Sequence, residues 1–334
     1  MTKVAVLGSG SWGTALAFHL ASVGHDVRLW GRNPDLIAEM TSRRVNAVYL
    51  PDVVLPIGVT PTASIEDTLA RADIVVAALP SHGTRAVIRS AAPFIPRQAL
   101  IVSATKGLEQ DTLMRVSEVI VQEVRGARPV AVLSGPSFAM EVARGLPTAV
   151  AVACADPVLA EDLQRQFRST YLRLYATSDV IGVEVGGALK NTIAIAAGVV
   201  EGLGLGQNAL AALITRGLAE ITRLACAVGG RRETLAGLSG LGDLVLTCTG
   251  SLSRNRHVGI ELAHGRQISD VVAGMKMVAE GVRTTTAALE LGRKHGVELP
   301  IATQMAEVLA GRRSAALAVE DLMLRPQKAE QESR

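Results

Sequence analysis

The chain begins with a short apolar strand pattern that runs directly into a glycine-rich turn. Residues 3–7 are followed by the spacing G-x-G-x-x-G at Gly8, Gly10 and Gly13, and residues 14–17 then favour a helix. Gly8 permits a tight turn, Gly10 lets the backbone approach a pyrophosphate, and Gly13 lets the helix pack on the strand. The pyrophosphate would lie on free N–H groups at the positive end of the helix dipole. This order of strand, turn and helix is the setting that a dinucleotide-binding turn requires.

Strand and helix patterns alternate through the first half of the chain. Such alternation predicts an α/β fold with a mostly parallel, doubly wound, Rossmann-like sheet. Ligands of these sheets bind at the carboxyl ends of the strands. Gly8, Arg32, Pro80, Lys106 and Gly135 all follow predicted strands, so we expect them to converge on one crevice. The predicted strands are residues 4–7, 27–30, 73–79, 99–103, 130–133, 149–152 and 171–175.

Beyond Ser178 the strand pattern stops, and helical patterns separated by glycines continue towards the end of the chain. We therefore expect an NAD(P)-binding Rossmann-like domain at residues 1–185 and an all-α, substrate-binding domain at residues 186–330. Ser178 is the expected cap of the first long helix, and Asn208 is the expected cap of the second.

Composition argues against several classes of function. The net charge is +3 and aromatic residues make up 3% of the chain, so nucleic-acid binding is not indicated. The longest apolar stretch, residues 192–200, is too short to cross a bilayer, which needs about 20 apolar residues. The first strand begins at once and leaves no room for a signal peptide. We expect a cytoplasmic protein without an integral membrane segment.

Cysteine and histidine usage agrees with that compartment. The three cysteines, Cys154, Cys226 and Cys248, lie far apart and are odd in number. This pattern suits reduced thiols in a cytosolic core better than a disulfide framework. The histidines are scattered without metal-ligand spacing, so we expect no metal site.

The residues after the second predicted strand bear on the choice of nucleotide. An NAD-selective site usually offers an acidic residue there to the ribose hydroxyls, and this chain has Arg32 instead. A guanidinium can pair with the 2′-phosphate of NADP and stack on adenine. The sequence therefore favours NADP, with NAD tolerated. The alternative is that Arg32 is a surface cation whose side chain reaches solvent.

Four polar clusters lie beside glycines at the predicted ends of helices and strands. Two follow strands of the nucleotide domain and two belong to the helical domain. A cleft between the domains would bring them together, and small-molecule sites often lie in such clefts. The clusters are residues 103–109, 133–139, 189–191, and 242–243 with 253–256.

Lys190 lies in an otherwise apolar helix pattern, where a lysine is costly unless it faces a polar cleft. Buried near a second cation such as Lys106, it could have a lowered pKa and act as a general base. The alternative is a lysine that extends its ammonium group to the surface. Asp243 could orient a lysine through a charge-assisted hydrogen bond, or could cap a helix or lie in its first turn.

Ser253, Arg254 and Asn255 bring hydroxyl, guanidinium and amide donors together at a predicted helix start. Such a set suits a phosphate monoester dianion. The alternative is a basic, exposed turn.

In these residues the chain closely resembles bacterial-type NAD(P)-dependent glycerol-3-phosphate dehydrogenase. The matching stretches occur in the order of the family and cover nearly all of residues 3–325, and only the tail is unmatched. One such motif alone is unspecific, whereas the ordered set is highly specific. The stretches are residues 8–15, 104–109, 134–139, 189–191, 240–244, 253–256 and 278–281.

The resemblance implies interconversion of sn-glycerol 3-phosphate and dihydroxyacetone phosphate, which supplies glycerol 3-phosphate for glycerophospholipid synthesis. It implies a cytoplasmic homodimer that uses NADP or NAD, with Lys190 as the proton donor and acceptor. Lys106 would stabilise negative charge and Asp243 would orient a lysine. Around the substrate it places Lys106, Gly135, Ser137, Lys190, Asp243, Ser253, Arg254 and Asn255. Against the nucleotide, beside Gly8, Gly10 and Gly13, it places Ser11, Trp12, Arg32, Lys106, Ala139, Arg254, Val278 and Glu280.

Two other functions stay open on the residues alone. A 3-hydroxyacid or 6-phosphogluconate-type dehydrogenase also uses a lysine on a helix after the nucleotide domain, although residues 104–109 and 253–256 argue against it. A non-catalytic NADP-sensing module would keep the glycine turn, but it would have no need for Lys106, Lys190 and Asp243 together.

Overall fold

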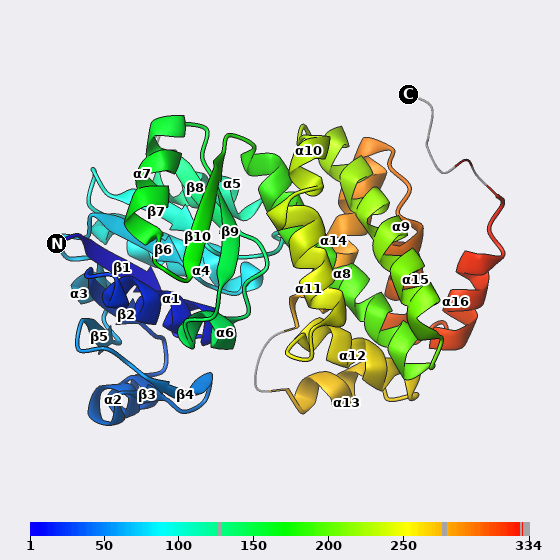
Figure 1. Ribbon diagram of the computed structural model, residues 1–334, viewed down its shortest axis with the longest axis horizontal. Helices are drawn as coiled ribbons and strands as arrows, with labels where there is room; N and C mark the ends of the chain where they lie inside the picture. The colour runs from blue at the N-terminus through cyan, green and yellow to red at the C-terminus, as the bar shows by residue number, and fades with distance from the viewer. Residues whose placement is uncertain (126–128, 276–278, 328, 330–334) are drawn as a thin grey trace.

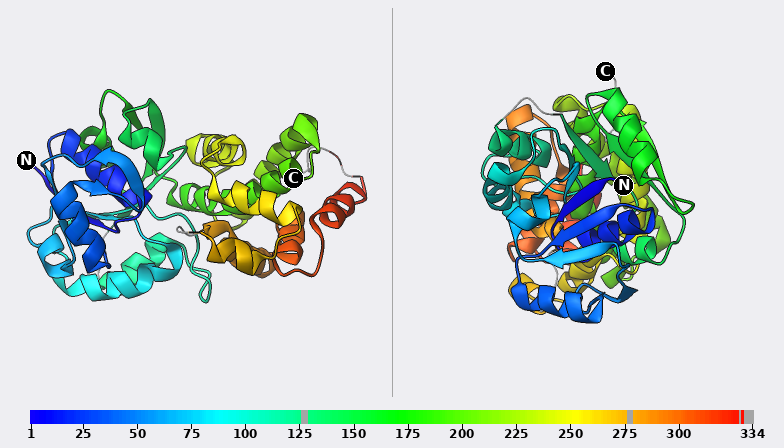
Figure 2. Two further views of the ribbon diagram at one scale, coloured as in Figure 1. Left: turned by 90° about the horizontal axis from the view of Figure 1, so that it is seen from below. Right: turned by 90° about the vertical axis from the view of Figure 1, so that its left-hand side faces the viewer.

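The computed structural model describes residues 1–125, 129–275, 279–327 and 329. Figure 1 shows a half that contains the sheet and a helical half, lying side by side along the long axis of the molecule. The same division is visible from below (Figure 2, left). The strands of the described chain lie before residue 178, and helices follow from residue 180. The predicted fold class is therefore confirmed.

The main sheet has eight strands in the order β10-β9-β8-β7-β6-β1-β2-β5. The chain runs outward from β1 in both directions, so the topological switch point lies between β1 and β6. Neighbouring strands are parallel except β8 and β9, which pair antiparallel. The strands are β1 (Lys3–Leu7), β2 (Asp26–Trp30), β5 (Val59–Thr62), β6 (Ile74–Ala77), β7 (Leu100–Ser103), β8 (Val130–Ser134), β9 (Thr148–Ala153) and β10 (Leu172–Thr177).

Sequence patterns located seven of these strands and missed β5. That strand lies at one end of the sheet and contains Pro61, a residue that lacks the N–H needed for pairing in central strands. A separate antiparallel pair, β3 (Val45–Asn46) and β4 (Leu50–Val54), was also not predicted.

The central strands are buried on both faces, which explains their nearly continuous apolar sequence. In β1, Val4 and Val6 belong to one apolar core, whereas Ala5 and Leu7 belong to a second core across the sheet. This half also contains α1 (Ser11–Ser22), α2 (Pro34–Arg43), α3 (Ile65–Leu69), α4 (Ser81–Ala91), the 3-10 turn η1 (Ala92–Phe94), α5 (Val116–Val124), α6 (Ala139–Ala143) and α7 (Pro157–Phe167).

The helical half is built around α8 (Val180–Gly202), whose residues from Gly182 to Val200 are all buried. The predicted division at residues 185 and 186 falls inside this helix. Around it pack α9 (Gly206–Ala227), α10 (Arg232–Leu235), the π-helical turn η2 (Leu238–Gly242), α11 (Asp243–Thr249), α12 (Arg254–Ala263), α13 (Ile268–Ala273), α14 (Glu280–His295), α15 (Pro300–Leu309) and α16 (Ala315–Met323).

The two predicted helix caps were wrong. Asp179 caps α8, because its Oδ1 accepts from the backbone N–H of Gly182 at 2.8 Å. Ser178 lies one residue too early, and its hydroxyl accepts from Arg231 instead. The second helix already begins at Gly206, so Asn208 lies within its first turn.

Helix α8 is long and apolar enough to cross a membrane by length and composition, and 89% of its most apolar 18-residue window is buried inside the protein. The bent pair Arg232–Thr249 and Arg254–Ala263 passes the same test together. Burial of this degree is typical of the core helix of a globular domain.

The cysteines are free thiols, as expected. Cys154 and Cys248 are buried, but Cys226 is exposed near the end of α9 and does not belong to a core.

Candidate active site

The glycine turn joins β1 to α1 at the carboxyl edge of the sheet, beside the switch point. Gly8 has a φ of 118°, and a Cβ there would lie 2.4 Å from the carbonyl oxygen of Ala78. A Cβ on Gly13 would lie 1.9 Å from the carbonyl oxygen of Gly8. A Cβ on Gly10 would meet nothing within 4 Å, so the space over the helix N-terminus is open. This geometry fits a bound pyrophosphate.

The other residues expected at the nucleotide lie around this turn. Ser11 and Trp12 begin α1, Arg32 is exposed just beyond β2, and Ala139 begins α6. Trp12 and Ala139 pack against the same small apolar cluster. The indole N–H of Trp12 is buried and has no hydrogen-bond partner among the described residues. Val278 lies outside the described residues.

Lys106, Lys190 and Asp243 meet where the two halves of the molecule join. Lys106 follows β7, Lys190 lies in α8, and Asp243 begins α11. The Lys190 Nζ lies 2.8 Å from Oδ1 of Asp243, and the Lys106 Nζ lies 2.6 Å from Oδ2. Lys106 also donates to the carbonyl oxygen of Gly135 at 2.9 Å. Two ammonium groups therefore share one carboxylate.

The surroundings of Lys190 make its proton easier to remove. The pKa of Lys190 is lowered to about 8, chiefly by burial and also by the charge of Lys106. The negative charge of Asp243 acts in the opposite direction, but it does not outweigh burial. A lysine in this state can release or take up a proton close to neutral pH.

Thr247 completes the lysine site, and sequence reasoning missed it. Its Oγ1 accepts from the Lys190 Nζ at 2.7 Å and donates to the backbone carbonyl of Asp243 at 2.6 Å. Thr247 lies one helical turn after Asp243, so both side chains share a face of α11. The i, i+4 spacing between Asp243 and Thr247 is the sequence signal that could have identified Thr247.

The residues expected to bind the substrate phosphate lie at the start of α12, which packs on α8. Ser253 caps α12, with its hydroxyl accepting from the N–H of Arg256 at 3.3 Å. Arg254 is the first residue of that helix and is exposed. Asn255 is buried and donates to Oδ1 of Asn191, the neighbour of Lys190, at 2.9 Å. This contact joins the start of α12 to α8 at the residue that follows Lys190.

Ser137 and Glu280, two further predicted site residues, lie close to the junction of the two halves. Ser137 donates to the carbonyl oxygen of Gly135 at 3.0 Å, and the same oxygen accepts from Lys106. Glu280 begins α14 and accepts from the hydroxyl of Ser81 at 2.6 Å and from its N–H at 3.2 Å. Ser81 begins α4, so this contact links the helical half to the sheet-containing half.

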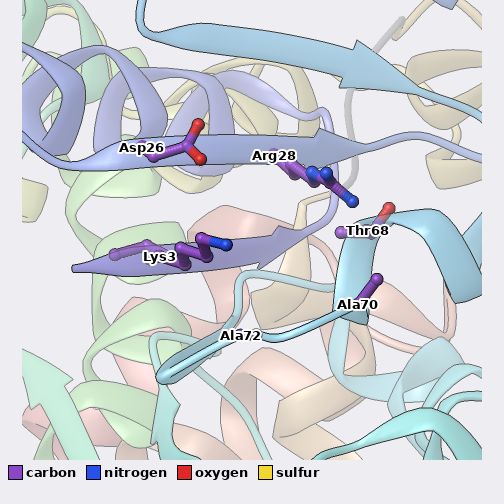
Figure 3. A pocket seen from close by; sticks show the side chains of 7 residues that line it. Lys3, Asp26, Arg28, Thr68, Ala70 and Ala72 are labelled. Atoms are coloured by element: carbon purple, nitrogen blue, oxygen red, sulfur yellow. The ribbon is translucent and has the colours of Figure 1, made fainter. Parts of the chain in front are cut away.

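A small hollow at the opposite edge of the sheet is not part of this site. Figure 3 shows it at the amino-terminal ends of β1 and β2, lined by Lys3, Asp26, Arg28 and Thr68 among others. Its volume is about 10 Å³, which is room for about one water molecule. Across the described ranges, no group of three His, Cys, Asp or Glu residues could hold a metal ion.

A glycine turn at the switch point of a doubly wound sheet, and a buried lysine paired with a carboxylate where the helical half begins, are typical of two-part NAD(P)-dependent oxidoreductases. The family model for the N-terminus of NAD-dependent glycerol-3-phosphate dehydrogenase matches residues 3–160, and the model for its C-terminus matches residues 179–320. The chain belongs to the NAD-dependent glycerol-3-phosphate dehydrogenase family.

Individual relatives agree with this family. A glycerol-3-phosphate dehydrogenase (NAD(P)+) of Koribacter versatilis is 51% identical over 275 residues, covering 81% of this chain and 82% of the relative. The enzyme of the same name from Acidobacterium capsulatum is 53% identical over 279 residues, covering 81% and 82%. The crystal structure of glycerol-3-phosphate dehydrogenase from Coxiella burnetii has a TM-score of 0.94 at 40% identity, covering 97% of this chain and 99% of that chain.

Proposed function

We propose that this chain interconverts sn-glycerol 3-phosphate and dihydroxyacetone phosphate, with Lys190 transferring the proton and NADP as the preferred cofactor. The observation that carries the proposal is the pair of ammonium groups on Asp243, at distances of 2.6 and 2.8 Å. The pair lies at the carboxyl edge of a sheet whose first turn fits a dinucleotide. Family membership supplies the substrate class.

The nicotinamide supplies or accepts the hydride when it is bound. In the reducing direction, the Lys190 ammonium donates its proton to the ketone oxygen of dihydroxyacetone phosphate. In the oxidising direction, neutral Lys190 takes the proton from the C2 hydroxyl of glycerol 3-phosphate. The Lys106 ammonium stabilises the negative charge that develops on the same oxygen. Asp243 holds both side chains in position.

The phosphate group of the substrate anchors the reacting carbon. The guanidinium of Arg254 and the amide of Asn255 are suitable donors to a phosphate dianion, and Ser253 places them at the start of α12. The Asn255–Asn191 hydrogen bond keeps this anchor next to Lys190. Gly135 and Ser137 would line the substrate from the sheet-containing half.

The nucleotide would lie along the glycine turn from Ser11 and Trp12 towards Arg32. Since Arg32 stands where NAD-selective sites usually have a carboxylate, we expect it to pair with the 2′-phosphate of NADP. Ala139, Arg254, Val278 and Glu280 are the remaining proposed nucleotide contacts, with Lys106 shared between nucleotide and substrate.

We assign nucleotide binding to residues 1–185 and most substrate contacts to residues 186–330. We further propose that the enzyme is a cytoplasmic homodimer that supplies glycerol 3-phosphate for glycerophospholipid synthesis. The family resemblance supports this role, and sedimentation of the purified protein would test the dimer.

Absorbance at 340 nm tests the proposal directly, because that wavelength follows the reduced nicotinamide. The purified chain is mixed with dihydroxyacetone phosphate and NADPH, and then with NADH. We expect substrate-dependent oxidation of both, faster with NADPH. Binding of NADPH without reduction of any ketone would instead support a sensing module, and activity on hydroxy acids alone would support another dehydrogenase class.

A further inference from the structure

A short hairpin that follows Lys106 belongs by sequence to the sheet-containing half but packs into the helical half. Leu108 is 3% exposed and lies in the apolar core built around α8. Leu113 packs against the same core. Residues 108–117, here called the hairpin arm, therefore anchor the segment just after Lys106 to the helical half.

The hairpin arm is closed by its own backbone. Leu108 and Arg115 form an isolated antiparallel bridge. The N–H of Glu109 donates to the carbonyl of Met114, and the N–H of Leu113 donates to the carbonyl of Glu109, both at 3.0 Å. Leu113 has a φ of 61°, a conformation that a leucine adopts only when its surroundings impose it. Both the hydrogen bond of its N–H to Glu109 and the packing of its side chain on the α8 core accompany this conformation.

The end of the arm, where α5 begins, is tied to α8 by a buried carboxylate. Glu184 accepts from the guanidinium of Arg115 at 2.8 Å, from the N–H of Ser117 at 2.8 Å and from the Ser117 hydroxyl at 2.6 Å. The side chain of Glu184 is 2% exposed. Glu184 lies six residues before Lys190 on the same buried helix, so the arm and the proton-transferring lysine share one rigid support.

We propose that the hairpin arm is a positioning device that fixes the Lys106 ammonium relative to Lys190, with Leu113 and Glu184 as its positioning residues. The segment of Lys106 is then held by Asp243 and the Gly135 carbonyl directly, by Leu108 and Leu113 in the core, and by Glu184 through Arg115 and Ser117. The arm is also tied to the sheet-containing half, because Arg85 of α4 pairs with Glu109 at 2.6 Å.

This inference rests on the proposed proton transfer by Lys190, and it predicts a specific signature. The charge of Lys106 helps to lower the pKa of Lys190. When the arm loosens and Lys106 withdraws, the pKa of Lys190 should rise. In the reducing direction, where protonated Lys190 is the acid, the alkaline limb of the kcat profile should then move to higher pH.

Leu113→Gly tests the arm, because it removes the packed side chain while accepting the left-handed backbone. Arg71→Gly is the matched control, since Arg71 is an exposed residue with a φ of 60° outside the arm. We expect kcat of Leu113→Gly to fall about tenfold or more, KM for NADPH to stay within about twofold, and the alkaline limb to move up. The control should match the wild type.

Glu184→Gln is the second variant, and it carries the test if Leu113→Gly fails to fold. It keeps the size of the side chain and removes the charge that holds Arg115, so it should shift the limb in the same direction. Wild-type kcat, or a lower kcat with an unshifted limb, would overturn the role of the arm. Absence of dihydroxyacetone phosphate reduction by the wild type would instead overturn the proposed function.

Discussion

Asp243 holds Lys190 through Oδ1, at 2.8 Å, and leaves Oδ2 for a second ammonium, that of Lys106. The Asp243 side chain is 2% exposed and that of Lys190 is 7% exposed. One carboxylate is thus paired with two cations in a site that is largely shielded from water. The remaining positive charge favours an anionic substrate and a developing alkoxide.

Replacement of Lys190 by alanine should remove the proton-transferring group. We expect kcat to fall by at least ~10², the usual contribution of general acid–base catalysis. Steady-state assays in both directions measure it, with Lys294→Ala as a control because Lys294 is an exposed lysine on α14. Near-normal turnover of the Lys190 variant would remove its catalytic role.

Asp243→Asn should move the pH profile of kcat for ketone reduction to lower pH. The negative charge of Asp243 raises the pKa of Lys190 against the lowering effect of burial, so its loss should lower that pKa further. We expect kcat for ketone reduction to drop more than about tenfold and its alkaline limb to move to lower pH. A limb that stays in place or moves up would contradict the charge relationship between the two residues.

Arg32→Ala should discriminate between the two cofactors. Loss of a guanidinium–phosphate pair should raise KM for NADPH at least about tenfold, since charged hydrogen bonds contribute about 1.5–3 kcal/mol. KM for NADH, which lacks the 2′-phosphate, should change little. Initial rates at varied NADPH and at varied NADH give the two KM values. An equal change in both would show that Arg32 does not pair with the 2′-phosphate.

Arg254→Ala should act mainly on substrate binding. If the guanidinium is the proposed donor to the substrate phosphate, its loss should raise KM for dihydroxyacetone phosphate about tenfold or more. A smaller rise for NADPH is expected, because Arg254 is also a proposed nucleotide contact. The phosphate assignment would fail if the substrate KM stayed at its wild-type value.

Glu220 should make the stability of the helical half depend on pH. Its carboxylate accepts from the N–H groups of Ile301 and Ala302 at 2.9 and 3.0 Å, but burial raises its pKa to about 7. Between about pH 4.5 and 7 the unfolded chain loses this proton while the folded chain keeps it. The free energy of unfolding should therefore fall, by up to about 3 kcal/mol, as pH rises through this window.

Urea titrations of the wild type and Glu220→Gln between pH 5 and 8 measure this effect. The glutamine does not titrate, so its contribution should be the same across the window. An equally steep fall in the glutamine variant would assign the pH dependence to other groups.

Much of the fold followed from local patterns. The first strand, the glycine turn and the first helix are specified by neighbouring residues, because apolar runs and glycine spacing act over a few positions. The cap of α3 is equally local, because the Ser64 hydroxyl accepts from the N–H of Asp67, three residues further on. The antiparallel pairing of β8 and β9 was not predicted, since strand direction is decided by the path of the chain between strands and not by strand composition.

Local residue patterns predicted a dinucleotide-binding sheet followed by helices, and they singled out Lys106, Lys190 and Asp243. The hydrogen bonds that these three share, the contact of Thr247 with them and the contact of Glu184 with the arm are visible only in the folded chain. The difference is one of range. Backbone propensities and apolar periodicity act between near neighbours, whereas the pKa of a lysine depends on burial and charges brought from distant parts of the chain.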